Sequence, residues 1–122
     1  MKIFLLMILC HVIDDFVFQP ICLSKLKQKN WWEKNAPDPL YKNDYTAALG
    51  MHSISWAIMI HLPLFLSISG IALGISVLFN FLIHYIVDDA KANEKRISLQ
   101  DDQIIHLMQI SLTCLIFSIW PM

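Results

Sequence analysis

Three pairs of a histidine and an aspartate, each four positions apart, are the residues of this sequence best suited to chemistry. They are His11 with Asp15, His84 with Asp88 and, in reverse order, Asp102 with His106. Residues four apart on a helix share one face, with about 5–6 Å between their Cβ atoms. Each pair lies in or beside an apolar run, where ionisable side chains are costly and usually functional. We therefore expect the three pairs to form one functional site.

The composition around these pairs is that of an integral membrane protein. Of 122 residues, 57% are hydrophobic and 16% are charged, against about 45–50% and about 25% in soluble domains. The length suits one domain, and no basic stripe indicates nucleic-acid binding. Apolar runs predict helices at about residues 3–19, 46–66, 71–90 and 101–120. The expected fold is all-α, an integral membrane four-helix bundle that forms a single domain over residues 1–122.

Helix-breaking and polar residues separate the four predicted helices. Pro20 ends the first helix, and residues 20–45 form a polar connection in which ICLSKLKQKNWW favours a short interfacial helix. A tight turn is expected from Ser67 to Gly70. Ser98 could be the N-cap of the last helix, with Asp101 and Asp102 in its first turn, where carboxylates favour the helix dipole.

The lysines and arginine indicate an orientation. Eight of the nine lie in two connections, the one after the first helix and the one after the third. The positive-inside rule places both connections in the cytoplasm and both termini outside. With helices alternating in direction, four histidines then lie at one depth, with a layer of aspartates just outside them. The histidines are His11, His52, His84 and His106, and the aspartates are Asp15, Asp88 and Asp102.

Histidines and carboxylates that face one another in a helical bundle are typical of metal sites. The predicted ligands are His11, Asp15, His52, His84, Asp88, Asp102 and His106. Imidazole and carboxylate suit one or two divalent transition metals, namely zinc, manganese or iron. Each aspartate could bind the metal, or could instead accept a hydrogen bond from the other ring nitrogen of its histidine. His52 has no paired carboxylate, and packing explains it as well as metal binding does.

The other polar residues have structural interpretations. His61 lies away from the histidine layer and is expected to bond a neighbouring helix. Solvated helix-end charges are expected at Asp14, Asp89 and Asp101. Interhelical or supporting hydrogen bonds are expected from Gln19, Asn80, Gln103 and Gln109. No disulfide is predicted among Cys10, Cys22 and Cys114, which lack any metal-binding spacing.

Three segments, HVIDDFVFQ, HYIVDDAK and DDQIIHL, resemble the domain of unknown function 3307 family of small bacterial and phage membrane proteins. The resemblance covers essentially the whole chain. The family pattern is His-x3-Asp-Phe with a Gln three positions further on, a later His-x3-Asp, and Asp-Gln-x2-His. It falls on His11, Asp15, Phe16, Gln19, His84, Asp88, Asp102, Gln103 and His106, and His52 matches a histidine common in the second helix. Doubled aspartates and a long lysine-rich first connection are departures, and they leave the ligating member of each doublet open.

The resemblance implies a multi-pass protein of the bacterial inner membrane and a bacteriophage or prophage source. The family has no established activity. It is similar in pattern to small membrane proteins that are labelled metal-dependent hydrolases by analogy. The resemblance therefore adds more about the fold than about the reaction.

The leading functional hypothesis is a metal-dependent hydrolase whose substrate is lipid-linked or lies at the cytoplasmic leaflet. Asp15, Asp88 or Asp102 would be its general base, and membrane lipid its expected partner. One alternative is a non-enzymatic proton or ion relay, which would need a homo-oligomer because four helices are few. A second is haem binding between facing histidines. A third is a phage-encoded protein that interacts with a host membrane protein.

Overall fold

The computed structural model describes residues 1–19, 21–65, 68 and 70–119. These residues form helices and loops and no strand, which confirms the all-α prediction. The elements are α1 (Lys2–Ile13), the π-helix η1 (Asp14–Phe18), α2 (Ile21–Leu26), α3 (Lys29–Asn35), the 3-10 helix η2 (Pro39–Tyr41), α4 (Asp44–Phe65), α5 (Ile71–Ala92) and α6 (Leu99–Ile119).

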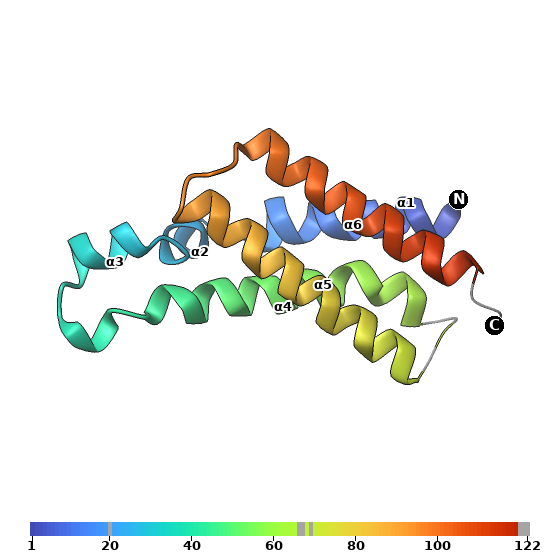
Figure 1. Ribbon diagram of the computed structural model, residues 1–122, viewed down its shortest axis with the longest axis horizontal. Coiled ribbons are helices and arrows are strands. Elements are labelled where there is room, and N and C mark those ends of the chain that lie inside the picture. The colour runs from blue at the N-terminus through green and yellow to red at the C-terminus, as the bar shows by residue number, and fades with distance from the viewer. Residues whose placement is uncertain (20, 66–67, 69, 120–122) are drawn as a thin grey trace.

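The four longest helical segments form an antiparallel bundle (Figure 1). The continuous segment of α1 and η1 contacts α4 and α6, and α5 also contacts α4 and α6, so each segment has two neighbours. The start of α1 and the end of α6 lie together at one end of the bundle. The other end carries α2, α3 and the loop between α5 and α6. The two lysine-rich connections therefore lie at the same end, as predicted.

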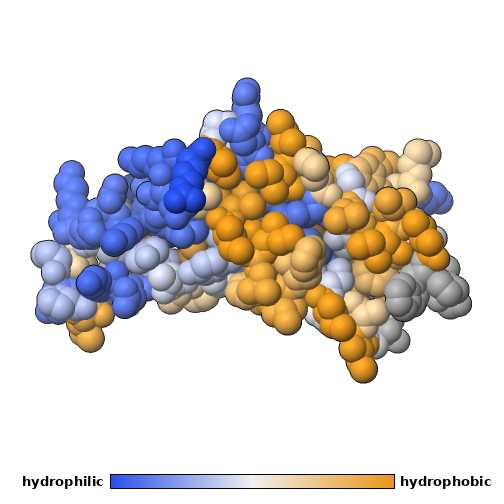
Figure 2. All heavy atoms as spheres, viewed as in Figure 1, coloured by the Kyte–Doolittle hydropathy of each residue, from blue (hydrophilic) through white to orange (hydrophobic). Residues whose placement is uncertain are grey.

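Three helical stretches are long and apolar enough to cross a membrane: Pro39–Phe65, Ile71–Ala92 and Leu99–Ile119. The segment formed by α1 and η1 is shorter, with 12 and 5 residues. Figure 2 shows hydrophobic side chains over the bundle and hydrophilic side chains at the end that carries α2 and α3. The chain is therefore a membrane protein. The four-helix bundle is confirmed in outline, with three helices of spanning length and one shorter helix.

The observed helix boundaries differ slightly from the predicted ones. The second long helix begins two residues earlier, at Asp44, the third continues two residues further, to Ala92, and the fourth begins two residues earlier, at Leu99. The backbone N–H of Asp101 donates to Ser98 Oγ at 3.2 Å, which confirms Ser98 as the N-cap. Several expectations at helix ends fall on residues outside the described ranges, namely Pro20, Leu66, Ser67 and Trp120.

The connection between η1 and α4 packs against the bundle more closely than the sequence indicated. It contains α2, α3 and the 3-10 helix η2, and both α2 and α3 contact α4. The backbone N–H of Lys29 donates to Asn93 Oδ1 at 2.7 Å, and Asn93 Nδ2 donates to the carbonyl oxygen of Lys27 at 3.1 Å. These bonds tie the connection to the loop after α5. They hold Lys27 over the end of the bundle.

The interior of the bundle is divided into an apolar half and a polar half. The apolar half, toward the start of α1, contains a cluster of buried residues: Met7, Trp56, Ala57, Ile60, Leu64, Leu73, Ile110 and Phe117. The polar half, toward α2, contains buried histidines and aspartates. Trp56 belongs to the apolar cluster and also contacts the histidines. The two halves therefore adjoin at this indole ring.

Candidate metal centre

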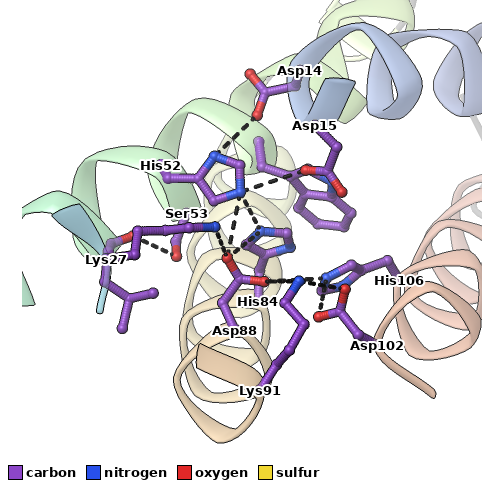
Figure 3. Close-up of polar contacts among 12 residues, drawn as sticks. Asp14, Asp15, Lys27, His52, Ser53, His84, Asp88, Lys91, Asp102 and His106 are labelled. Carbon is purple, nitrogen blue, oxygen red and sulfur yellow. Dashed lines mark hydrogen bonds and ion pairs between the residues drawn. The ribbon is translucent and has the colours of Figure 1, made fainter. Parts of the chain in front are cut away.

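The long helices bring the predicted site residues together at the α2 end of the bundle (Figure 3). They come from five elements: His11 from α1, Asp15 from η1, His52 from α4, His84 and Asp88 from α5, and Asp102 and His106 from α6. Asp14 of η1, which the sequence analysis did not assign to the site, joins them. All except Asp15 are at most 3% exposed, and the Asp15 side chain is 9% exposed. The predicted gathering of histidines and aspartates is confirmed. Their role as metal ligands stays a prediction.

The π-helix η1 determines how the first aspartate doublet is presented. In an α-helix, consecutive side chains point about 100° apart, because 3.6 residues make one turn. The wider turn of a π-helix, which is often found at functional sites, lets Asp14 and Asp15 both reach His52. Asp14 Oδ2 lies 3.7 Å from His52 Nδ1, and Asp15 Oδ1 lies 3.4 Å from His52 Nε2. The two carboxylates therefore face opposite nitrogens of one imidazole ring.

His52 Nε2 is the atom at which the site converges. His84 Nε2 lies 3.2 Å from it, Asp15 Oδ1 lies 3.4 Å from it, and Asp88 Oδ2 lies 3.5 Å from it. Ligand atoms of Asp15, His52 and His84 all lie within 4.8 Å of one another. The rings of His52 and His84 are tilted by 57°, with centroids 5.0 Å apart, so they are not stacked on one another. We name these three residues the first ligand group.

A second group of potential ligands consists of His84, Asp88 and His106. Its two histidine rings are stacked, with centroids 4.1 Å apart and planes 26° apart. An imidazole lone pair lies in the ring plane, so stacked rings direct their lone pairs side by side and not toward one ion. The first ligand group is therefore the better metal site.

The geometry of the first ligand group fits a small divalent ion. A tetrahedral ion with bonds of about 2.0–2.2 Å separates its ligand atoms by about 3.3–3.6 Å. The distances of 3.2 Å and 3.4 Å from His52 Nε2 are close to this range. Five buried atoms of the cluster make no hydrogen bond within the described part of the chain: Asp14 Oδ2, Asp15 Oδ1, His84 Nδ1, Asp102 Oδ1 and His106 Nε2. Buried polar groups normally have a partner, so the donor set suits a cation.

Two lysines that the sequence analysis assigned to the two lysine-rich connections reach into this cluster. Lys27 Nζ lies 2.5 Å from Asp88 Oδ2, and the Lys27 side chain is only 4% exposed. Lys91 Nζ lies 2.6 Å from Asp102 Oδ2 and 3.5 Å from Asp88 Oδ1. Four carboxylates thus meet two ammonium groups. The remaining charge matches one divalent cation or two protonated histidines.

His106 faces carboxylates without a hydrogen-bond donor between them. Its Nδ1 lies 3.1 Å from Gln109 Oε1, which can only accept, so Nδ1 carries a proton. Its Nε2 lies 3.2 Å from Asp102 Oδ1 and 3.6 Å from Asp88 Oδ1. The Asp102 contact is short, but its angles do not form a hydrogen bond. A second proton or a nearby cation would make these contacts favourable.

His11 lies in the same layer but has hydrogen-bond partners on both nitrogens. Trp56 Nε1 donates to His11 Nδ1 at 2.8 Å. His11 Nε2 lies 3.2 Å from Gln103 Oε1, and Gln103 Nε2 donates to Asp15 Oδ2 at 3.3 Å and to Asp102 Oδ2 at 3.1 Å. His11 therefore belongs to neither ligand group. It acts with Gln103 as support for Asp15.

The three aspartate doublets differ in which of their two side chains is buried. Asp88 and Asp102 point inward, while Asp89 is half-buried and bonds Asn93, and Asp101 is exposed and caps α6. These outcomes match the expectation for the second and third doublets. The expectation for Asp14 is wrong: it is 1% exposed and accepts a hydrogen bond from Ser55 Oγ at 2.6 Å. The π-helix, which the sequence pattern did not indicate, turns it inward.

His61 and Asn80, which lie outside this layer, have the structural roles that the sequence predicted. His61 Nδ1 donates to the carbonyl oxygen of Ala57 at 2.7 Å, and its Nε2 accepts from Ser76 Oγ on α5 at 2.8 Å. Asn80 Nδ2 donates to Thr113 Oγ1 at 3.0 Å. His61 and Asn80 therefore link helices. The three cysteines are free, as predicted.

Besides Asp14 and Lys91, the sequence analysis missed Trp56 and Lys27. Trp56 lies four positions after His52, on the same helix face, and its ring stacks on His84 with centroids 4.2 Å apart. Its spacing from His52 could have indicated a place in the site. Lys27 had no such signal, because only the folding of α2 against the bundle brings its ammonium group to Asp88.

Comparison with known proteins gives a family and no activity. The family model described as "Protein of unknown function (DUF3307)" matches residues 3–120, so the chain belongs to that family. This match confirms the resemblance of the three histidine and aspartate motifs. No curated protein and no solved structure matches the chain.

Proposed function

We propose that this protein binds one divalent transition metal through Asp15, His52 and His84 and is a membrane-embedded metal-dependent hydrolase. The observation that carries the proposal is the convergence of Asp15 Oδ1 and His84 Nε2 on His52 Nε2, at 3.4 Å and 3.2 Å. Two histidines and one carboxylate form the ligand set of many catalytic zinc sites, which keep a fourth position open. Zinc, manganese and iron all suit these ligands.

The surrounding residues would orient the ligands. The Asp14 carboxylate faces His52 Nδ1 at 3.7 Å, on the side of the ring away from Nε2. A carboxylate in this position favours the tautomer that leaves Nε2 free to bind a metal. The indole ring of Trp56 stacks on His84 and limits its rotation. Both ligand histidines are thus held by neighbouring side chains.

Asp88 is the residue best placed to act as general base. Its Oδ2 lies beside the first ligand group, 3.5 Å from His52 Nε2, and is paired with Lys27. The ammonium group keeps the carboxylate in the charged form that accepts a proton and also weakens it as a base, so the proposed role rests on the position of Asp88 beside the ligands. A bound metal would supply the Lewis acid that polarises the substrate and activates that water.

A lipid-linked substrate fits the position of the site. The cluster lies at the end of the bundle where the hydrophobic surface meets the hydrophilic α2 and α3 (Figure 2). The ester and phosphate groups of membrane lipids lie at this boundary. The lysine-rich connections at the same end favour the cytoplasmic face of the bacterial inner membrane, with both termini outside. Reporter fusions to the C-terminus test this orientation: a fusion active only in the cytoplasm would contradict it.

The first experiment is elemental analysis of the detergent-purified protein prepared without chelator. We expect about one equivalent of a transition metal in the wild type, a loss of that metal in His84→Ala, and no change in the matched control His61→Ala. His61 bonds Ala57 and Ser76 and none of the proposed ligands, so its removal leaves the ligands in place. Equal metal content in wild type and His84→Ala would refute the metal site.

The hydrolase reaction is tested by the same preparation with phospholipid and acyl-ester substrates. We expect metal-dependent hydrolysis that is lost in Asp88→Asn while bound metal is retained. Hydrolysis that persists in Asp88→Asn would refute the role of Asp88. Absence of turnover by the metal-loaded wild type on both substrate classes would refute the hydrolase proposal.

A proton or ion relay is the second candidate function. It is favoured by Lys27 and Lys91, whose ammonium groups already lie 2.5 Å and 2.6 Å from Asp88 and Asp102. In that case the cluster would hold protons and no metal. Absence of metal from the wild type, together with proton or ion flux in reconstituted vesicles, would favour this function over the hydrolase.

A further inference from the structure

A groove runs between α5 and α6 on the face of the bundle seen in Figure 2. The cavity has a volume of about 690 Å³. Its walls are mainly large apolar side chains, among them Ile75, Phe79, Ile83, Ile105, Met108 and Leu112. Both walls belong to helices of membrane-spanning length. The groove therefore opens toward the hydrocarbon of the bilayer.

The polar side chains at the floor of the groove bond one another. Asn80 Nδ2 donates to Thr113 Oγ1 at 3.0 Å, and Gln109 Nε2 donates to Asn80 Oδ1 at 3.3 Å. In Figure 2, hydrophilic side chains are visible between the hydrophobic walls of the two helices. Because these amide and hydroxyl groups already have partners, an apolar occupant would leave none of these bonds broken.

The length of the groove matches one leaflet of a bilayer. Its lining extends along α5 from Ala72 to Ile83. At 1.5 Å per residue this distance is about 17 Å, close to half of a hydrocarbon core of about 30 Å. The groove runs parallel to the helices, as the acyl chains of a bilayer do.

One end of the groove adjoins the candidate metal centre. Ile83 and Ile105 line this end, and the next residues in the chain are His84 and His106. Gln109 in the floor also bonds His106. Asp88 follows Ile83 by five residues, about 8 Å along the helix. A lipid with its chain in the groove would therefore carry its headgroup to the level of Asp88 and Lys91.

We propose that the groove binds an acyl chain of a membrane phospholipid and thereby positions the phosphate and ester groups of that lipid at the metal centre. Two features favour a lipid over a partner helix: the groove is about as long as an acyl chain in one leaflet, and one end of it adjoins a polar site that contains two lysines. The positioning part rests on the proposed function. Binding of the chain in the groove does not, because none of the groove walls belongs to the first ligand group.

The test is titration of the delipidated protein with phosphatidylglycerol, with bound lipid counted by native mass spectrometry. Leu112→Trp places a larger side chain in the groove. Its matched control is Leu115→Trp, on the same helix but outside the groove lining; Leu112 and Leu115 are 50% and 55% exposed. We expect about tenfold weaker lipid retention in Leu112→Trp, because about two methylene groups lose their contacts, and wild-type retention in Leu115→Trp.

Equal retention in the two tryptophan variants would overturn the proposal. A protein dimer that disappears in Leu112→Trp, without a change in lipid binding, would also overturn it and assign the groove to a second copy of the chain. His84→Ala separates this proposal from the proposed function. Lipid retention in His84→Ala at the wild-type level supports the groove whether or not the wild type binds metal, and its loss there contradicts independent binding of the chain.

Discussion

The two halves of the bundle both bury polar side chains, but they treat them differently. In the half that contains His61 and Asn80, the polar groups are uncharged and form hydrogen-bonded pairs between helices. In the half that contains His84, they include carboxylates and ammonium groups. Atoms such as Asp15 Oδ1 and His84 Nδ1 have no hydrogen-bond partner there in the part of the chain described. The polar side chains near His61 and Asn80 join helices, whereas those near His84 form the donor set of a binding site.

The difference shows that burial alone does not indicate whether a histidine is structural or binds a ligand; the groups that contact its nitrogens do. His61 and His84 are both fully buried, on neighbouring helices. His61 donates with one nitrogen and accepts with the other, so its hydrogen-bonding capacity is used. His84 Nε2 faces another imidazole nitrogen at 3.2 Å and the Asp88 carboxylate at 3.8 Å. Only the second environment gains from a cation.

The largest predicted effect is a loss of stability in the half of the bundle that contains His84. Lys27→Met should lower the free energy of unfolding by about 3 kcal/mol, because it removes the nearer of the two ammonium groups that pair with the buried Asp88 carboxylate and leaves only Lys91, at 3.5 Å. The matched control is Lys29→Met, since Lys29 forms an exposed ion pair with Glu33 at 3.9 Å. It should change stability by less than about 1 kcal/mol. Denaturant titration in detergent measures both. A loss in Lys27→Met no greater than in the control would mean that Asp88 does not depend on Lys27.

An intermediate effect on metal affinity distinguishes the two ligand groups. Gln103→Leu should weaken metal binding by about 10–100-fold, as is usual when a hydrogen bond to a ligand is lost, because Gln103 donates to Asp15. Gln109→Leu is the control, since Gln109 bonds His106, outside the first ligand group. It should leave metal affinity unchanged. Competition with a coloured chelator measures the affinities. A larger loss in Gln109→Leu would move the metal to the second group.

The smallest effect is a loss of stability in the half of the bundle that contains His61 and Asn80. Thr113→Val should cost only about 0.6 kcal/mol, the average value of an interhelical hydrogen bond in a membrane protein. The cost is small because Asn80 Nδ2 also donates to the carbonyl oxygen of Ser76 and keeps that partner. Bound metal should be unchanged. The same denaturant titration and elemental analysis apply, and a loss of metal in Thr113→Val would show that the two halves are not independent.

Much of this architecture could be predicted from the sequence because it follows from local periodicity. Apolar runs of membrane length define three spanning helices, and each pair of residues four positions apart lies on one helix face by the geometry of the helix itself. Alternation of helix direction then places His52, His84 and His106 at one end of the bundle. Family membership could also be recognised from the motifs, and the match to residues 3–120 confirms it.

The partners of each side chain were decided only by the tertiary structure. The sequence indicated neither the π-helix that turns Asp14 inward nor the packing of α2 that carries Lys27 to Asp88. Both depend on contacts between segments far apart in the chain, since the Lys27–Asp88 pair spans 61 positions. Local periodicity determines which face a residue occupies. Which atoms meet across the bundle depends on how the helices pack, and this packing separates the candidate ligands His52 and His84 from His11, whose nitrogens contact Trp56 and Gln103.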